Sequence, residues 1–476
     1  MIFTSFNFLL FFPTVILIYY LIPIKFRWKF ILISSLFFYA SIKPVYILLL
    51  LLISFFTYFF TLLIDSKTYN KKILLITSII TILSPLFFFK YYNSINTFII
   101  SILQTSKLKF DLPEINFLLP IGISYYTFMS IGYIIDVYNE EIKAEKKFGL
   151  VTLFLSFFPL VLSGPIERAE NMFSQFKNKL KFNYKKTVYG FKLILWGYFL
   201  KLVLADNLAL YLNPIFNEVN LHSGKTILLA VFLFPFQIYG DLGGYSLIAI
   251  GTASVMGINV RINFNKPFFS KSMSEFWRRW HMSLISWITD YIYTPISFYL
   301  RKFKLTGIIF SLLITFLVAG IWHEASLSFI IWGLIQGSII SFEAISKRKK
   351  NQFEKKFNLK NNKFYILFCI ILVYILFSIS LIFGGAFNSF SESIISINRI
   401  LSNSDPLYIN QRILIKSLLV IILILLTEFR DEYYPNKWLL FENKKGYIRW
   451  ISYYSIILII LFFGVFNQDN FIYFQF

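Results

Sequence analysis

The sequence predicts an all-α, polytopic integral membrane protein, and three properties of the chain lead to this fold class. Of the 476 residues, 57% are hydrophobic and only 15% are charged, with a mean hydropathy of +0.67. A soluble core could not absorb that much apolar surface. The hydrophobic residues also gather in runs close to the roughly 20 residues that an α-helix needs to cross the hydrocarbon layer. Lysine and arginine cluster in short segments between these runs, as in multi-pass membrane proteins.

The apolar runs suggest roughly a dozen membrane spans. They lie near residues 8–24, 28–42, 44–64, 72–92, 148–163, 187–204, 226–242, 305–321, 324–343, 363–384, 411–427 and 450–467. Two further apolar stretches, from Ile115 and from Phe236, are interrupted by glycine and proline, and we interpret them as re-entrant elements that line an interior. The first run lacks a basic region and a cleavage site, so we expect a retained span. We expect one membrane domain over residues 1–476.

The formal charge of +22 is concentrated in five basic segments. These are Lys25–Lys29, Lys143–Lys147, Lys177–Lys186, Arg301–Lys304 and Lys347–Lys363. Because basic loops stay on the cytoplasmic side of membranes, we place these segments in the cytoplasm, and Met1 and the loop Asn388–Asn410 outside. This pattern favours a lipid bilayer as partner over a nucleic acid.

Two of the three histidines lie beside or inside apolar sequence. His281 belongs to SEFWRRWHMSLISWITDYIYTPI, and His323 to GIWHEASLSFIIWG. An ionisable residue at such a place is costly, which marks it as a candidate functional residue. A neutral imidazole can take a proton from a hydroxyl and later return it. The alternative for His323 is a histidine whose polar atoms are satisfied by a neighbouring helix.

Residues from Ser274 onward read as one helix with two faces. Trp277, His281, Leu284, Ile288 and Tyr291 share one side, and Arg279, Ser283, Ser286 and Asp290 share another. Such a helix suits the wall of an aqueous chamber, because Arg279 and Asp290 would be costly against lipid. The alternative is an interfacial anchor whose tryptophan and tyrosine side chains lie at headgroup depth.

Other chemistries find little support in the sequence. We expect no metal site, because the chain has neither HExxH nor a Cys/His cluster, and His222 has no suitably spaced partner. The glycines of GDLGGYS do not form a phosphate-binding loop, and no GxSxG elbow is present. The single cysteine, Cys369, lies in an apolar run and is expected to be an inert buried thiol.

The two histidine segments together resemble the signature pair of the membrane-bound O-acyltransferases, in their bacterial branch that acts on cell-surface polymers. Similarity extends to MIFTSFNFLLFF, LPIGISYYTFMSIGYIIDVY, LSGPIER, GDLGGYSLIAIG and the closing FIYFQF. Two positions depart from the family pattern. Glu324 stands where a small residue is expected, and Leu247 stands where the branch often has an acidic residue.

The resemblance implies a ring of membrane helices around a central tunnel in which acyl donor and acceptor meet. It implies His323 as the catalytic residue and His281 as a second essential position. Candidates for the substrate-binding chamber are Asp241, Trp277, Arg278, Asp290 and Trp322.

The implied reaction passes an acyl group, for which we expect acetyl, across the bacterial cytoplasmic membrane to hydroxyls of an extracytoplasmic glycan. The donor would be acetyl-CoA or another acyl thioester, such as an acyl carrier protein, with no bound cofactor. An extracytoplasmic acetyltransferase or esterase-like partner would complete the transfer. Acceptors in order of preference are an exopolysaccharide, peptidoglycan and teichoic acid. Two alternatives stay open, a flippase or channel for a lipid-linked glycan and a scaffold that anchors a biosynthetic complex.

Overall fold

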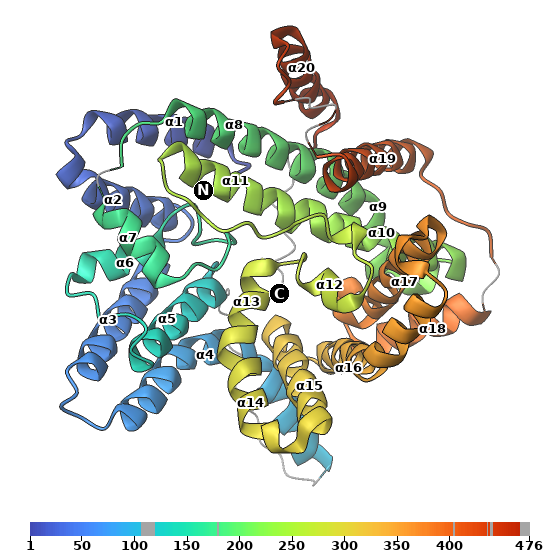
Figure 1. Cartoon of the computed structure of the whole chain (residues 1–476), viewed down its shortest axis with the longest axis horizontal. Coiled ribbons are helices and arrows are strands. Elements are labelled where there is room, and N and C mark those ends of the chain that lie inside the picture. The colour runs from blue at the N-terminus through green and yellow to red at the C-terminus, as the bar shows by residue number, and fades with distance from the viewer. Residues whose placement is uncertain (106–119, 179, 403–404, 436, 438–440, 467–476) are drawn as a thin grey trace. The chain divides into compact units, whose positions relative to one another are not determined.

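The computed structural model describes residues 1–105, 120–178, 180–402, 405–435, 437 and 441–466 (Figure 1). Within these ranges every regular element is a helix, which confirms the all-α prediction. The stretch from Ile115 begins outside the described residues, and the closing FIYFQF lies outside them altogether.

Eight helical segments of the described part are long and apolar enough to cross a membrane. They are Tyr46–Asp65, Lys71–Tyr92, Tyr184–Asn217, Gly224–Val255, Met282–His323, Leu327–Lys356, Lys363–Ser380 and Gly446–Phe463. A shorter apolar helix, α1 (Phe6–Leu21), begins the chain. Many large hydrophobic side chains on these helices are exposed, as is expected of surfaces that face lipid. The chain is a multi-pass membrane protein.

The chain divides into two compact units, and each unit is built from two separate stretches of the sequence. The first unit comprises Met1–Ile194 and Ser246–Arg261, and the second comprises Leu195–Tyr245 and Ile262–Phe476. The first unit contains α1, α2 (Arg27–Ala40), α3 (Tyr46–Asp65), α4 (Lys71–Thr105), α5 (Ile123–Tyr138), α6 (Phe148–Ser156), α7 (Ala169–Lys177), and most of α8 (Tyr184–Tyr198) and α11 (Gly244–Val255).

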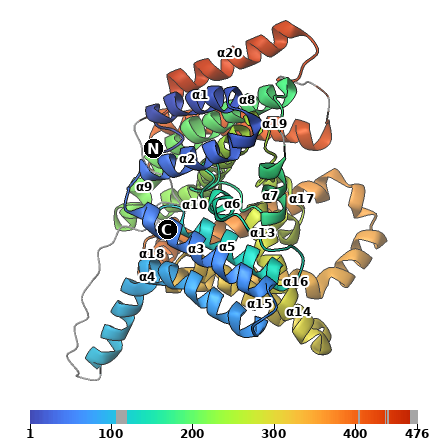
Figure 2. The same cartoon turned by 90° about the vertical axis from the view of Figure 1, so that its left-hand side faces the viewer.

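The second unit contains both histidine segments, with His281 and His323. Its α-helices are α9 (Asp206–Asn217), α10 (Gly224–Ile238), α12 (Met273–Trp277), α13 (Met282–Ile288), α14 (Thr294–Tyr299), α15 (Lys304–His323), α16 (Leu327–Lys356), α17 (Lys363–Ser380), α18 (Phe390–Ser402), α19 (Gln411–Tyr433) and α20 (Gly446–Phe463). Figure 2 shows the same helices from the side.

Helix α5 of the first unit is packed against α3 and α4. Nearly all of its side chains are buried, and Thr57 of α3 donates a hydrogen bond to Ser130 of α5 at 2.9 Å. The helix starts after Gly122, whose φ of +82° and position against the Val161 carbonyl leave no room for a side chain. The interruption seen in the sequence is therefore a turn before an unbroken, buried helix.

The predicted span 148–163 is wrong. Helix α6 has only nine residues, about 14 Å at the usual rise, and turns follow it up to Ser163. Pro159 and Gly164 mark this compact turn, where a Cβ on Gly164 would lie 2.6 Å from the Leu160 Cα. Residues 150–163 are all buried within the protein. Their apolar side chains therefore pack against other parts of the protein and do not contact lipid.

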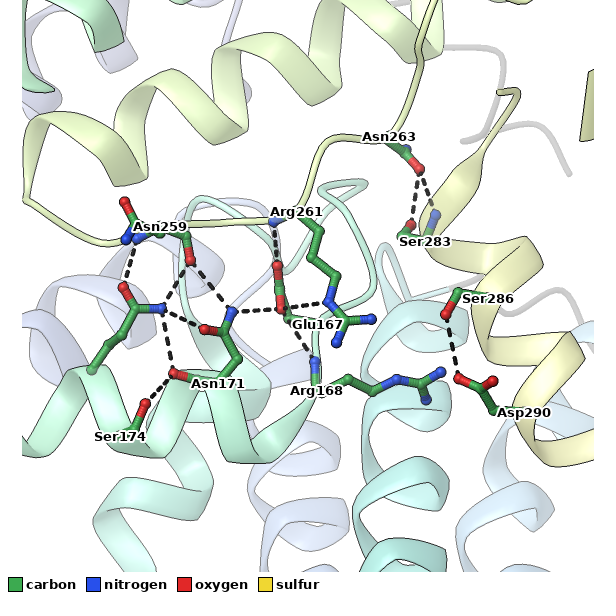
Figure 3. Close-up of polar contacts among 11 residues, drawn as sticks. Glu167, Arg168, Asn171, Ser174, Asn259, Arg261, Asn263, Ser283, Ser286 and Asp290 are labelled. Atoms are coloured by element: carbon green, nitrogen blue, oxygen red, sulfur yellow. Dashed lines mark hydrogen bonds and ion pairs between the residues drawn. The ribbon is translucent and has the colours of Figure 1, made fainter. Parts of the chain in front are cut away.

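A buried carboxylate organises the loop between α6 and α7 (Figure 3). Glu167 accepts hydrogen bonds from the backbone N–H of Arg261 and from the Asn171 amide, the latter at 2.9 Å. Burial raises the pKa of this carboxyl, although the hydrogen bonds from Arg261 and Asn171 oppose the shift. Glu167 thereby ties the segment around Arg261 to the start of α7.

The stretch from Phe236 belongs to a continuous helical segment, Gly224–Val255, so its glycines do not interrupt the helix as the sequence suggested. Helices α10 and α11 are joined by a π-helical turn at Tyr239–Gly243, and α8 and α9 by a similar turn at Phe199–Ala205. The glycines serve close packing between these turns. A Cβ on Gly240 would lie 2.9 Å from the Leu200 carbonyl oxygen, closer than real contacts allow.

The basic segment that begins at Lys347 is largely helical. Helix α16 continues through Lys356, so its 30 residues extend about 45 Å. A hydrocarbon layer is about 30 Å thick, so a helix of this length projects its charged end beyond the bilayer.

Candidate active site

Helices α15 and α16 form a hairpin whose close packing places aromatic rings beside His323. Glycines on both helices make this approach possible. A Cβ on Gly320 would lie 2.2 Å from the Phe329 carbonyl oxygen, and one on Gly333 would lie 2.4 Å from the Phe316 carbonyl oxygen. Small residues at such positions let membrane helices approach at backbone distance.

His323 is the last residue of α15 and lies in a cage of three rings. The centroid of its imidazole is 4.5 Å from Trp322, 5.8 Å from Phe329, and 5.4 Å from Trp332. The Phe329 ring is stacked on the imidazole, whereas the Trp332 indole meets it at 89°. The three rings are buried while His323 is half-buried, so the imidazole stays accessible on one side.

The turn into α16 follows from local sequence. Glu324 is extended, with φ of −160°, and ends α15. Ser326 then caps α16, because its side chain accepts a hydrogen bond from the Phe329 N–H at 3.4 Å. Glu324 is half-buried and directly follows His323 in the sequence.

The prediction of one helix from Ser274 through Tyr291 is wrong, because the chain turns at His281. Helix α12 ends at Trp277, and His281 has a left-handed backbone with φ of +44° before α13 begins. A non-glycine residue in this conformation is uncommon and costs roughly 1–3 kcal/mol. The surrounding contacts must hold it there.

Asn263 supplies those contacts. Its Oδ1 accepts hydrogen bonds from the Ser283 N–H at 3.2 Å and from the Ser283 hydroxyl at 2.9 Å (Figure 3), and it lies 3.1 Å from Nδ1 of His281. Because a backbone N–H must donate, the contacting Asn263 atom is an acceptor, and Nδ1 of His281 carries its proton. Burial lowers the pKa of His281 to about 3. The imidazole is thus neutral near pH 7, and Nε2 holds the lone pair.

Trp277 connects α12 to α16 and α17. Its indole N–H donates to Oε1 of Gln336 at 3.2 Å, and Gln336 donates to Ser380 at 2.7 Å. Its ring also lies 5.9 Å from Trp332. The structure therefore groups two of the predicted residues, Trp277 and Trp322, around the same aromatic cluster as His323.

The remaining predicted residues lie elsewhere in the second unit. Arg278 is exposed in the turn after α12. Asp290 is exposed in the π-helical turn Thr289–Tyr293 and accepts a hydrogen bond from Ser286 at 3.3 Å. Arg279 pairs with Glu275 at 2.7 Å and with Glu432 of α19 at 2.9 Å. Arg279 therefore has two carboxylate partners, which removes the cost that an unpaired arginine would have against lipid.

Asp241 belongs to a buried ion cluster at the two π-helical turns. Nζ of Lys201 lies 2.6 Å from Oδ1 of Asp241 and 2.7 Å from Oδ1 of Asp206, and all three side chains are 2% exposed. The sequence analysis missed Lys201 and Asp206. A lysine inside the apolar run 187–204 was the available signal, because a charge in a span needs a partner.

The comparisons with known proteins identify the family. Residues 34–387 match the family model described as the membrane-bound O-acyltransferase family. The chain belongs to this family. Both histidine segments lie within the matched residues, and membership favours an acyltransferase over the flippase and scaffold alternatives.

Several relatives carry the names of enzymes that act on alginate, peptidoglycan or teichoic acid. A probable alginate O-acetylase of Pseudomonas aeruginosa is 36% identical over 351 residues, which cover 72% of this chain and 66% of the relative. A peptidoglycan O-acetyltransferase of Helicobacter pylori is 29% identical, with 70% of each chain covered. A teichoic acid D-alanyltransferase of Bacillus subtilis is 31% identical, with 50% of this chain and 63% of that relative covered. The chain spans about half to two thirds of the length of most relatives that it matches.

Proposed function

We propose that the protein transfers an acyl group, namely acetyl, from a cytoplasmic thioester to hydroxyls of an extracytoplasmic glycan. The observation that carries this proposal is the half-buried imidazole of His323, held by three aromatic rings at the end of a membrane helix. Family membership and the names of the relatives support the same reaction class.

In the proposed step, His323 takes the proton of the acceptor hydroxyl as its oxygen attacks the thioester carbonyl. The C–S bond then breaks, and the proton on His323 passes to the departing thiolate. The donor is acetyl-CoA or another acyl thioester, including one on an acyl carrier protein, and it is a substrate and not a resident cofactor. His281, with its lone pair on Nε2, is the second proposed catalytic position. Asp241, Trp277, Arg278, Asp290 and Trp322 remain proposed as chamber residues.

The acceptor is proposed to be an exopolysaccharide, in preference to peptidoglycan and teichoic acid, with an extracytoplasmic acetyltransferase or esterase-like partner. The relative named as a probable alginate O-acetylase supports the preference for an exopolysaccharide, because its identity of 36% is higher than the 29% and 31% of the peptidoglycan and teichoic acid enzymes. The test is to delete the gene, isolate the three polymers, and identify their ester-linked groups by mass spectrometry after mild base. Loss of acetyl from the exopolysaccharide, restored by the wild-type gene, is the expected result. Unchanged acylation of all three polymers would refute the function.

We further propose that the protein lies in the bacterial cytoplasmic membrane with its basic segments inside. A cysteine introduced as Gln352→Cys, with Cys369→Ala to remove the native thiol, is expected to resist an impermeant maleimide in intact cells. The same cysteine should react after the cells are permeabilised. Residue 352 lies in the exposed charged end of α16, so access to the reagent depends on the side of the membrane. Labelling in intact cells would place this segment outside and reverse the topology.

A further inference from the structure

Trp332 is the ring that connects the two signature segments. Its indole lies 5.4 Å from the imidazole of His323 and 5.9 Å from the ring of Trp277, measured between centroids. Only 5% of its surface is exposed. A shift of this indole would therefore change the position of the His323 imidazole that it contacts.

Packing alone sets the orientation of the Trp332 indole. Its Nε1 is buried and makes no hydrogen bond to any residue in the described ranges. Buried indole N–H groups usually find an acceptor, which then fixes the ring. Here that restraint is absent, so the ring must be held by the surfaces on either side of it.

One of those surfaces is the backbone of Gly384. This residue lies in the turn Ile382–Ala386, which follows α17. A Cβ on Gly384 would lie 2.5 Å from Cδ1, 2.7 Å from Nε1 and 3.1 Å from Cγ of Trp332. The φ of Gly384 is −99°, which any residue can adopt. Glycine is therefore needed here for space, and not for its backbone freedom.

We propose that Gly384 and Trp332 are positioning residues for His323. The bare backbone at position 384 lets the indole lie back far enough to support the imidazole without displacing it. Any side chain at 384 would push the indole out of its place against His323. This inference rests on the proposed role of His323 as the base. A displacement of about 1 Å in a reacting group can cost about 10²-fold in rate.

The first experiment measures transfer in membranes of the native strain, supplied with radiolabelled acetyl-CoA and carrying the full-length protein. Gly384→Ala is expected to lower kcat by about 10²-fold, with an unchanged KM for acetyl-CoA, because the base is misplaced while the donor still binds. Trp332→Ala is expected to lower kcat as well. The double variant should be no slower than Trp332→Ala alone, because the alanine at 384 then has no indole to displace.

A second readout does not depend on activity. Diethyl pyrocarbonate modifies accessible imidazoles, and mass spectrometry of the peptides gives the rate at each histidine. Gly384→Ala is expected to change the modification rate of half-buried His323 several-fold, because a displaced indole no longer shields the imidazole as it does in the wild type. His222, which is half-buried beside Tyr408, serves as the internal reference and should react at an unchanged rate.

Gly446→Ala is the matched control, because a Cβ there would meet only the Arg449 guanidinium at 3.8 Å. It should behave as wild type in both assays. If His323→Ala is inactive while Gly384→Ala matches Gly446→Ala, the positioning role is refuted and the proposed function stands. If His323→Ala retains wild-type transfer, the proposed function itself fails.

Two further outcomes would overturn the positioning role. One is a Gly384→Ala effect that persists in full on the Trp332→Ala background, because the glycine would then act elsewhere. The other concerns the case in which Gly384→Ala does not accumulate in membranes. Trp332→Phe then takes its place, since the smaller ring loosens the support of His323. Wild-type kcat and an unchanged His323 modification rate in Trp332→Phe would refute the proposal.

Discussion

His323→Ala is expected to abolish acylation of the glycan while the protein remains folded and inserted in the membrane. Loss of a positioned general base costs about 10²–10⁴-fold in rate, which leaves polymer acylation near the detection limit. The imidazole is half-buried, and two of the rings around it, Phe329 and Trp332, pack against each other at 6.2 Å and can keep this contact without it. The measurement is the amount of ester-linked acyl groups on the isolated glycan, in a deletion strain that expresses each variant at a membrane level checked by immunoblot.

His222→Ala is the matched control, because it removes a half-buried histidine that lies before α10 and outside the aromatic cage. It should acylate as wild type does. His281→Ala should also impair transfer, and it adds a structural cost, because the Asn263 contact that supports the left-handed turn is lost. A well-expressed His323→Ala protein with wild-type acylation would exclude His323 as the base.

Lys201→Met is expected to destabilise the protein more than any of the histidine substitutions. The ammonium group lies within 2.7 Å of both Asp206 and Asp241, and all three side chains are 2% exposed. Its removal takes away the cation that both buried carboxylates contact. Breaking a buried ion pair in this way costs about 3–5 kcal/mol, a large part of the roughly 5–15 kcal/mol by which proteins are stable. Thermal unfolding in detergent, followed by fluorescence-detected size exclusion, measures the effect.

A variant that neutralises the whole cluster distinguishes the effect of uncompensated charge from the effect of changed side-chain packing. Lys201→Met combined with Asp206→Asn and Asp241→Asn removes the uncompensated charges with little change in volume, and it should recover most of the lost thermal stability. If Lys201→Met alone unfolds at the wild-type temperature, the cluster does not hold the two π-helical turns together. In that case Asp241 would be left with its proposed role in the chamber.

Part of the candidate site was predictable because its residues are unusual for their surroundings. His323, Trp322 and Trp277 stand out as polar or aromatic residues near the ends of apolar runs, and the structure groups the two tryptophans with His323. Trp332 and Gly384 were not predictable in this way. A tryptophan and a glycine in apolar segments look ordinary until their contact is known, and 52 positions of chain separate them.

The turn at His281 was missed for a different reason. The spacing of Trp277, His281 and Leu284 fits a helical face, and nothing local interrupts it. The break depends on Asn263, which accepts hydrogen bonds from Ser283 and lies against His281 across 18 residues of sequence. The helical periodicity correctly predicts α12 before the turn and α13 after it, but a tertiary contact breaks the helix between them.

By itself the sequence determined that this chain is an all-α membrane protein, and it singled out two histidines as candidate functional residues. Membrane insertion depends on the composition of single segments, because each helix satisfies its own backbone hydrogen bonds in lipid. The tertiary structure alone decided which apolar segments pack inside the protein, as residues 150–163 do, and which neighbours surround each polar group. A residue buried against protein and one that faces lipid are equally apolar, so only the contacts between distant segments can distinguish them.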